Sequence, residues 1–178
     1  FSKANPEIKI IALRYFNPVG AHESGLIGES PLNKPNNILP VICNSADTGE
    51  EMMVFGGDYD TRDGSCIRDY VHVSDIAEAH VKAFEYLIGD KSLSYDVYNL
   101  GLGIGNRFEN QGLTVLEVIK SFEKVNNVKV NYKIGLRREG DIVQIYSNST
   151  KARKIGWKPT RTVDDMVSSA WKWHKNKI

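Results

Sequence analysis

IKIIALRYF, residues 8–16, is the stretch that decides the fold class, and it runs directly into Asn17-Pro18-Val19-Gly20. A nearly continuous apolar run of this length is typical of a strand buried on both faces of a parallel sheet. Pro18 has no amide donor, so the ladder of hydrogen bonds stops there. Residues 21–37, which contain glycines and two prolines, then predict a long loop, and long loops in compact domains tend to be functional.

Outward from this stretch, strands and helices alternate along the 178 residues. Short apolar or alternating runs predict strands at residues 52–55, 66–73, 96–100 and 128–134. Capping residues predict helix starts at Asn37, Asp75, Thr114 and Thr162, and a short helix over residues 151–155 that ends at Gly156. We expect the strands at 8–16 and 96–100 to share a parallel sheet and the others to form a smaller layer. The chain is therefore predicted to be α/β, with two interwoven parts.

Composition argues against several classes of protein. The 23 basic and 22 acidic residues give a net charge of +1, and nucleic-acid binding usually needs a concentrated basic face. No apolar run approaches the roughly 20 residues of a membrane-spanning helix. Cys43 and Cys66 stand without metal-ligand spacing, and the four histidines form no ligand set. We therefore expect no nucleic-acid, membrane or metal partner, and a cytoplasmic location.

Four motifs occur in a fixed order: RYFNPVGAH at 14–22, PNN at 35–37, GSCIRDYVHV at 64–73 and RREGD at 137–141. Together they resemble the UDP-glucose (UDP-galactose) 4-epimerases of the extended short-chain dehydrogenase/reductase superfamily. The resemblance implies the last strands of a Rossmann-like parallel sheet interwoven with a small mixed α/β substrate-binding domain. It assigns residues 1–20 and about 66–100 to the Rossmann-like layer. Residues of about 21–65 and 101–178 fall mainly in the UDP-sugar-binding domain.

The resemblance also implies that much of the enzyme lies in an amino-terminal half outside this sequence. Such enzymes hold NAD on a glycine-rich strand-to-helix turn and transfer a proton with a Tyr-x-x-x-Lys pair. No tyrosine here has a lysine four positions later. We therefore assign no catalytic residue to this chain and expect no epimerase turnover from it alone. Tyr15 and Pro18 match residues that border the nicotinamide and are the expected NAD contacts.

Arg68 and Arg138 are the principal binding candidates. The resemblance implies that both hold the diphosphate of a UDP-sugar, since guanidinium groups can fork hydrogen bonds onto phosphate oxygens. The alternative is a pair of surface ion pairs, Arg68 with Asp69 and Arg138 with Glu139. Asp141 matches the residue that accepts hydrogen bonds from the ribose hydroxyls, and it is also a candidate partner for Arg138.

The other substrate contacts come from several segments. Asn17 and Asn37 match diphosphate or sugar contacts, although isolated asparagines are more often turn or helix-cap residues. Phe55 matches the strand beside the uracil, with a core role as its alternative. Ile145 falls at a gate beside the sugar and leaves the acceptance of N-acetylated sugars open. The full set is Phe16, Asn17, Asn37, Ile38, Met53, Phe55, Arg68, Tyr70, Arg138, Asp141 and Ile145.

The whole enzyme is then expected to be a homodimer that interconverts UDP-glucose and UDP-galactose through a 4-keto intermediate. Two alternatives stay open: another dehydratase or epimerase of nucleotide sugars, and a non-catalytic UDP-sugar-binding module. Residues 107–113 (RFENQGL) resemble an insertion relative to the usual short link and are expected to form a surface excursion.

Overall fold

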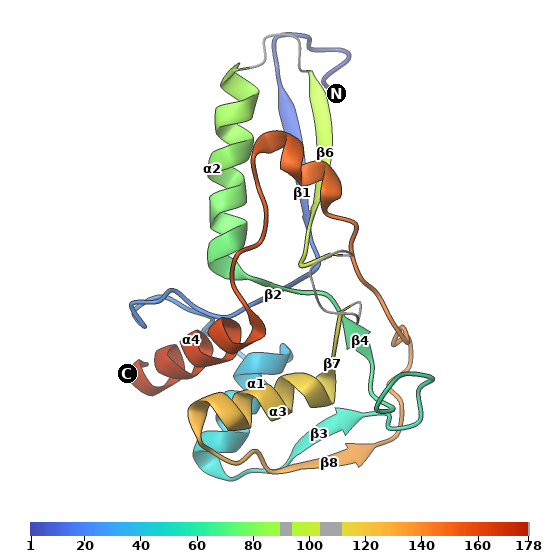
Figure 1. The fold of residues 1–178 in the computed structure, drawn as a ribbon, viewed down its shortest axis with the longest axis vertical. Coiled ribbons are helices and arrows are strands. Elements are labelled where there is room, and N and C mark those ends of the chain that lie inside the picture. Colours follow the sequence, from blue (N-terminus) through green and yellow to red (C-terminus); the bar gives the residue numbers. More distant parts are fainter. Residues whose placement is uncertain (90–93, 104–111, 178) are drawn as a thin grey trace.

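The structure, a computed structural model, describes residues 1–89, 94–103 and 112–177. Its elongated upper part contains β1 (Ile10–Tyr15) and β6 (Tyr95–Leu100), with α2 (Val73–Gly89) alongside (Figure 1). The two strands pair in parallel, from Ile10 opposite Tyr95 to Tyr15 opposite Leu100. This pairing confirms the predicted α/β class and the predicted partnership of these two strands.

The lower part of the molecule is a mixed layer of three helices and short strand pairs (Figure 1). Its helices are α1 (Ile38–Thr48), α3 (Val115–Asn126) and α4 (Val163–Asn176). Its parallel strand pairs are β3 (Met52–Phe55) with β8 (Tyr132–Gly135) and β2 (Asn17–Val19) with β5 (Tyr70–His72). β4 (Ile67–Arg68) and β7 (Leu113–Thr114) form an antiparallel pair. The 3-10 helix η1 (Thr150–Ile155) lies in the upper part of the molecule (Figure 1). Of the segment 107–113, only Gly112 and Leu113 lie among the described residues.

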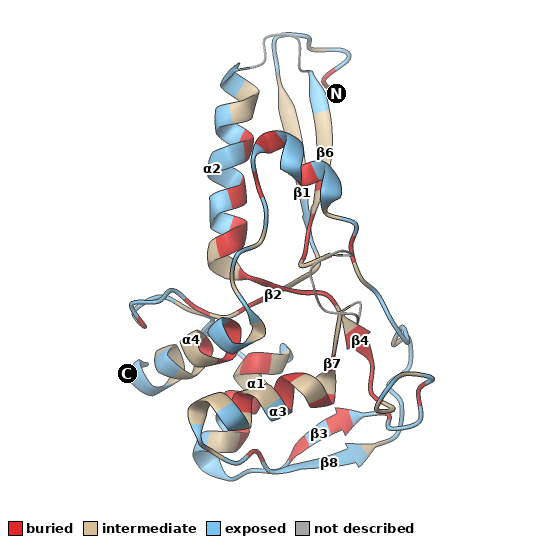
Figure 2. Ribbon diagram, viewed as in Figure 1, coloured by how far each residue is buried: buried red, intermediate tan, exposed pale blue. Residues whose placement is uncertain are grey.

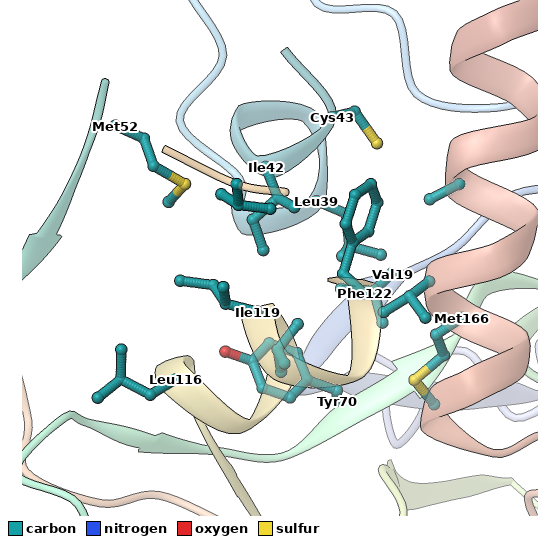
Figure 3. Packing of buried hydrophobic residues seen from close by; sticks show 14 of the residues in the cluster. Val19, Leu39, Ile42, Cys43, Met52, Tyr70, Leu116, Ile119, Phe122 and Met166 are labelled. Atoms are coloured by element: carbon teal, nitrogen blue, oxygen red, sulfur yellow. The ribbon is translucent and has the colours of Figure 1, made fainter. Parts of the chain in front are cut away.

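Two hydrophobic cores hold these parts (Figure 2). In the lower core, side chains of α1, α3 and α4 meet; Ile42, Phe122 and Met166 are almost fully enclosed (Figure 3). The upper core packs Tyr98 and Leu100 of β6 against α2 and the segment that contains η1. Such burial is the main favourable term in folding, at about 25 cal/mol per Å² of apolar surface.

Local capping signals were mostly correct. Thr114 and Glu117 form the predicted capping box of α3, and Gly156 ends η1 with a left-handed φ of 74°. Asp75, however, does not begin a helix. It lies inside α2, buried, where its carboxylate accepts hydrogen bonds from Thr160 and Arg161.

Three strand predictions need correction. Residues 8–16 give a shorter strand whose end is exposed, because among the described residues β1 pairs only with β6. Residues 66–73 form two strands, since β4 joins β7 whereas β5 joins β2. Residues 128–130 are not in a strand, because Glu123 accepts the amides of Val128 and Val130 through its backbone and side chain, respectively.

Asp69 stands at the break between β4 and β5 and ties three segments together. Its backbone carbonyl accepts the Asn17 amide at 2.9 Å. Its buried carboxylate accepts the amides of Leu102 and Ser147, both at 2.8 Å, and that of Gly103 at 3.3 Å. One side chain therefore satisfies backbone donors from two loops that follow different strands.

His72 is buried in β5 and held neutral by its neighbours. Its Nδ1 accepts the Ser74 amide at 3.0 Å, so the proton lies on Nε2, which donates to the Ser169 hydroxyl at 3.1 Å. Burial, and then the charge of Arg161, lowers the pKa of His72 below its ordinary value.

We expect the free energy of unfolding to fall as the pH is lowered from about 7.5 to about 5.5, since unfolded His72 takes up a proton near pH 6.5 whereas the lowered pKa of folded His72 shifts its protonation to lower pH. The unfolded state then binds more protons, so stability present above the unfolded pKa is lost on the way down. Urea unfolding at several pH values measures this slope. His72→Gln should flatten it. An equal slope in His72→Gln would assign the pH dependence to other groups.

Candidate functional site

A cleft of about 650 Å³ opens where the upper and lower parts meet. The segment from Phe16 to Gly20 lines one side, and α1 and the start of α2 contribute the others. Five of the predicted substrate residues line this cleft: Phe16, Asn17, Asn37, Ile38 and Tyr70. Tyr70 is nearly enclosed and packs beside Leu116 and Ile119 in the lower core (Figure 3). The structure therefore brings together residues that lie far apart in the sequence.

The backbone hydrogen-bond partner changes between Phe16 and Asn17, where the chain enters the cleft. Phe16 still donates its amide to Leu100 at the end of β6, whereas Asn17 donates to Asp69 and stands opposite Tyr70. Gly20 follows with a φ of +86°, and a Cβ there would lie 2.9 Å from the His72 ring. Glycine is thus required for the backbone to turn away from β2 at this point.

Tyr15 and Pro18, the predicted nicotinamide neighbours, are both exposed. Pro18 lines the cleft, and Tyr15 lies at the end of β1 with its ring 5.7 Å from that of His80. His80 Nδ1 donates to the Ile76 carbonyl, so its Nε2 accepts the Tyr15 hydroxyl at 2.7 Å. Tyr15 is therefore exposed but oriented by the hydrogen bond to His80.

A second group of residues surrounds Asp141, where the two predicted arginines meet. Arg138 Nη2 lies 2.8 Å from Asp141 Oδ1, and Arg68 Nη2 lies 3.6 Å from the same oxygen. Arg68 and Asp141 are largely buried, with side chains 17% and 11% exposed, whereas Arg138 is 59% exposed. The ion-pair alternatives with Asp69 and Glu139 are therefore wrong, and Asp141 is the common partner.

Phe55 and Met53 lie on the outer face of β3, because Met52 and Val54 point into the core. The Arg138 guanidinium lies over the Phe55 ring, 5.5 Å from its centroid. Phe55 is 45% exposed, which excludes the alternative of a core role. The Phe55 ring therefore presents an exposed apolar face beside two guanidinium groups that share one carboxylate.

Ile145 is connected to the segment that carries Arg68 by a backbone hydrogen bond. Its amide donates to the Ile67 carbonyl, next to Arg68, and its side chain is partly exposed. Arg68 also donates to the backbone carbonyl of Ile142 at 2.6 Å. Arg68 of the Asp141 group and Tyr70 of the cleft are only two residues apart in the sequence, on either side of Asp69. The backbone therefore connects the Asp141 group directly to the cleft.

Sequence reasoning missed three residues of this region: Glu29, Asp69 as a carboxylate acceptor, and His80 as the partner of Tyr15. Asn37, expected to cap α1, occupies the N-cap position but makes no side-chain cap bond. Its amide instead donates to Glu29 Oε1 at 2.7 Å. The position of Glu29 in the long loop was the only signal available for it.

Within residues 1–89, 94–103 and 112–177, no group of three or more His, Cys, Asp or Glu side chains is arranged to hold a metal ion. In that same part of the chain, no helix has both the length and the apolar character for a membrane span.

The region combines two arginines, a shared carboxylate and an exposed aromatic ring with a cleft on an α/β fold. Over residues 3–170 the sequence matches the family described as GDP-mannose 4,6 dehydratase. The chain belongs to this family, which lies within the extended short-chain dehydrogenase/reductase superfamily.

Individual relatives are epimerases. A UDP-glucose 4-epimerase of Erwinia amylovora is 46% identical over 175 residues, covering 97% of this chain and 49% of that protein. The bifunctional UDP-glucose 4-epimerase and UDP-xylose 4-epimerase 3 of Arabidopsis thaliana is 49% identical over 173 residues, covering 96% of this chain and 47% of that protein. The chain thus spans about half the length of these relatives.

Solved structures with a similar fold are also UDP-glucose 4-epimerases. The UDP-glucose 4-epimerase of Stenotrophomonas maltophila, with bound NAD and formylated UDP-arabinopyranose, superimposes with a TM-score of 0.89 at 42% identity. The enzyme of Bifidobacterium longum, in complex with NAD+ and UDP, gives a TM-score of 0.87 at 44% identity. Each comparison covers 98% of this chain and 50% of the other. The fold matches the carboxyl-terminal region of Rossmann-like epimerases, as the motifs implied.

Proposed function

We propose that this chain is the UDP-sugar-binding portion of a UDP-glucose 4-epimerase, and that the whole enzyme interconverts UDP-glucose and UDP-galactose. The observation that carries the proposal is the convergence of Arg68, Arg138 and Asp141 beside the exposed ring of Phe55. Guanidinium groups suit the diphosphate, and a carboxylate suits the ribose hydroxyls. The flat face of Phe55 suits the uracil, with Met53 on the same side of β3.

The chain's own part in the reaction is to hold UDP while leaving the hexose room to turn. Its anchors lie at the diphosphate and the nucleoside, so binding energy is spent away from the reacting carbon. The cleft lined by Phe16, Asn17 and Tyr70 takes the sugar, with Asn37 and Ile38 at its α1 side. Ile145 limits the space on the opposite side.

When bound, NAD would supply hydride transfer at C4 of the sugar. In this chain, Tyr15 and Pro18 are proposed to border the nicotinamide, consistent with their exposure at and beside the cleft. The contact with His80 keeps the Tyr15 ring from folding into that space.

Two hydrophobic cores support the proposed division into parts, although Val19 and Tyr70, from the ranges assigned to the first part, pack in the lower core. Residues 1–20 and about 66–100 belong to the Rossmann-like layer, and about 21–65 and 101–178 mainly to the UDP-sugar-binding domain. The segment that contains η1 packs with the first part, which makes the two parts interwoven. The whole enzyme is proposed, from its family resemblance, to be a cytoplasmic homodimer.

Calorimetric titration of the chain with UDP tests the proposal, alongside Arg138→Ala. Saturable binding is expected, weakened in the variant by about 1.5–3 kcal/mol, because a charge-assisted hydrogen bond is lost. Arg153→Ala is the matched control, since that arginine is exposed on η1. Circular dichroism confirms that each variant is folded. Absence of UDP binding by the folded wild-type chain contradicts the proposed UDP site. Equal UDP affinity in the wild-type chain and Arg138→Ala contradicts the role of Arg138 in that site.

A further inference from the structure

One face of α4 fixes the long loop that follows β2. The blue loop lies beside the red helix in Figure 1. Side chains three and four positions apart on α4 bind successive backbone groups of this loop at 2.7–3.2 Å, because that spacing places them on one face. The contacts join Ser169 to Ala21, Lys172 to Glu23, Asn176 to Gly25 and Trp173 to Glu29.

Trp173 contacts this loop through both its ring nitrogen and its ring face. Its Nε1 donates to the Glu29 carbonyl at 2.9 Å, and its ring lies flat against Gly28, where a Cβ would be only 2.4 Å from ring atoms. Any side chain at residue 28 would push the loop away from α4. The backbone of Glu29 is therefore held in a defined position at the rim of the cleft.

The Glu29 carboxylate in turn orients Asn37. Glu29 Oε1 lies 2.7 Å from Asn37 Nδ2, and an ionised carboxylate can only accept hydrogen bonds. The Asn37 side chain must therefore turn its NH2 group toward Glu29. One further N–H and the carbonyl oxygen of this amide remain for other partners, since the side chain makes no cap bond to α1.

We propose that Glu29 is a positioning residue, which fixes the amide of Asn37 so that its second N–H donates to the diphosphate or sugar of the bound ligand. The assignment rests on the proposed function, because it takes the cleft as the sugar site. Glu29 does not bind the diphosphate itself, since two anions repel one another. It acts through Asn37, whose amide dipole the carboxylate polarises.

The pairing is tested first without ligand, by following the side-chain amide resonances of Asn37 in nitrogen-15 NMR spectra. In Glu29→Ala these resonances should move away from their wild-type positions, because the hydrogen bond to Oε1 is lost. In Glu29→Gln they should stay close to the wild-type positions, because the new side chain still accepts a hydrogen bond. Asn37 amide resonances that do not move in Glu29→Ala, or that move equally in both variants, overturn the proposal.

The functional role is tested by a double-mutant cycle in which UDP-glucose binding is measured. Glu29→Ala should weaken binding by about 3- to 10-fold, and Glu29→Gln by less than about 2-fold. In an Asn37→Ala background, Glu29→Ala should add almost nothing, because its effect passes through the asparagine. Additive losses, or no loss in Glu29→Ala, overturn the positioning role. A wild-type chain that does not bind UDP-glucose contradicts the proposed function, and the amide resonances of Asn37 in the two Glu29 variants then decide the pairing of Glu29 with Asn37 separately.

Discussion

Replacing Asp69 with alanine is expected to lower the free energy of unfolding by about 3–5 kcal/mol, because the change leaves buried backbone donors of two loops without a partner. The carboxylate is 1% exposed and tightly enclosed, since a Cβ on Gly101 would lie 2.3 Å from its Oδ2. Water therefore has little room to replace it. Urea denaturation followed by circular dichroism measures the change.

Two further variants sharpen this test. Asp69→Asn keeps one acceptor oxygen and the same shape, so an intermediate loss is expected. Asp60→Ala removes an exposed aspartate nine residues away in the sequence and should change stability by less than about 0.5 kcal/mol. A loss in Asp69→Ala no larger than that of Asp60→Ala means that the carboxylate contributes nothing to joining the loops.

Replacing Arg68 with alanine is expected to weaken UDP binding by about 2–3 kcal/mol, roughly 30- to 150-fold. Its guanidinium is less exposed than that of Arg138, so solvent screens its interaction with a phosphate less. The loss also leaves Asp141, a mostly buried carboxylate, with Arg138 as its remaining arginine partner. Calorimetric titration with UDP measures both effects together.

Arg68→Lys separates charge from geometry. Lysine keeps the positive charge but cannot fork two parallel hydrogen bonds, so only partial recovery is expected. Full recovery in Arg68→Lys means that charge alone matters at this position. Affinity unchanged in Arg68→Ala removes Arg68 from the proposed diphosphate site.

The sequence correctly predicted features that depend on neighbouring residues. Thr114 and Glu117 exchange hydrogen bonds within one helical turn, so their pattern is sufficient to locate the start of α3. The apolar run at residues 52–55 likewise located β3 with its observed bounds. The motifs around Arg68 and Arg138 gave the family because they are specific in combination.

The same local reasoning failed where a distant partner competes for a side chain. Asp75 has the sequence context of a helix cap, yet its carboxylate accepts hydrogen bonds from Thr160 and Arg161. Asn37 has the position of a cap, yet Glu29 takes its amide. Tertiary contacts overrode the local preference in both cases.

The sequence by itself therefore determined the α/β class, most helix starts and the residues that resemble a UDP-sugar site. Only the tertiary structure decided that Asp141 serves both arginines, that Tyr15 is held by His80, and that Glu29 faces Asn37. The physical reason is range: periodicity and capping arise from bonds within a few residues, whereas these pairings depend on how the folded chain brings distant segments together.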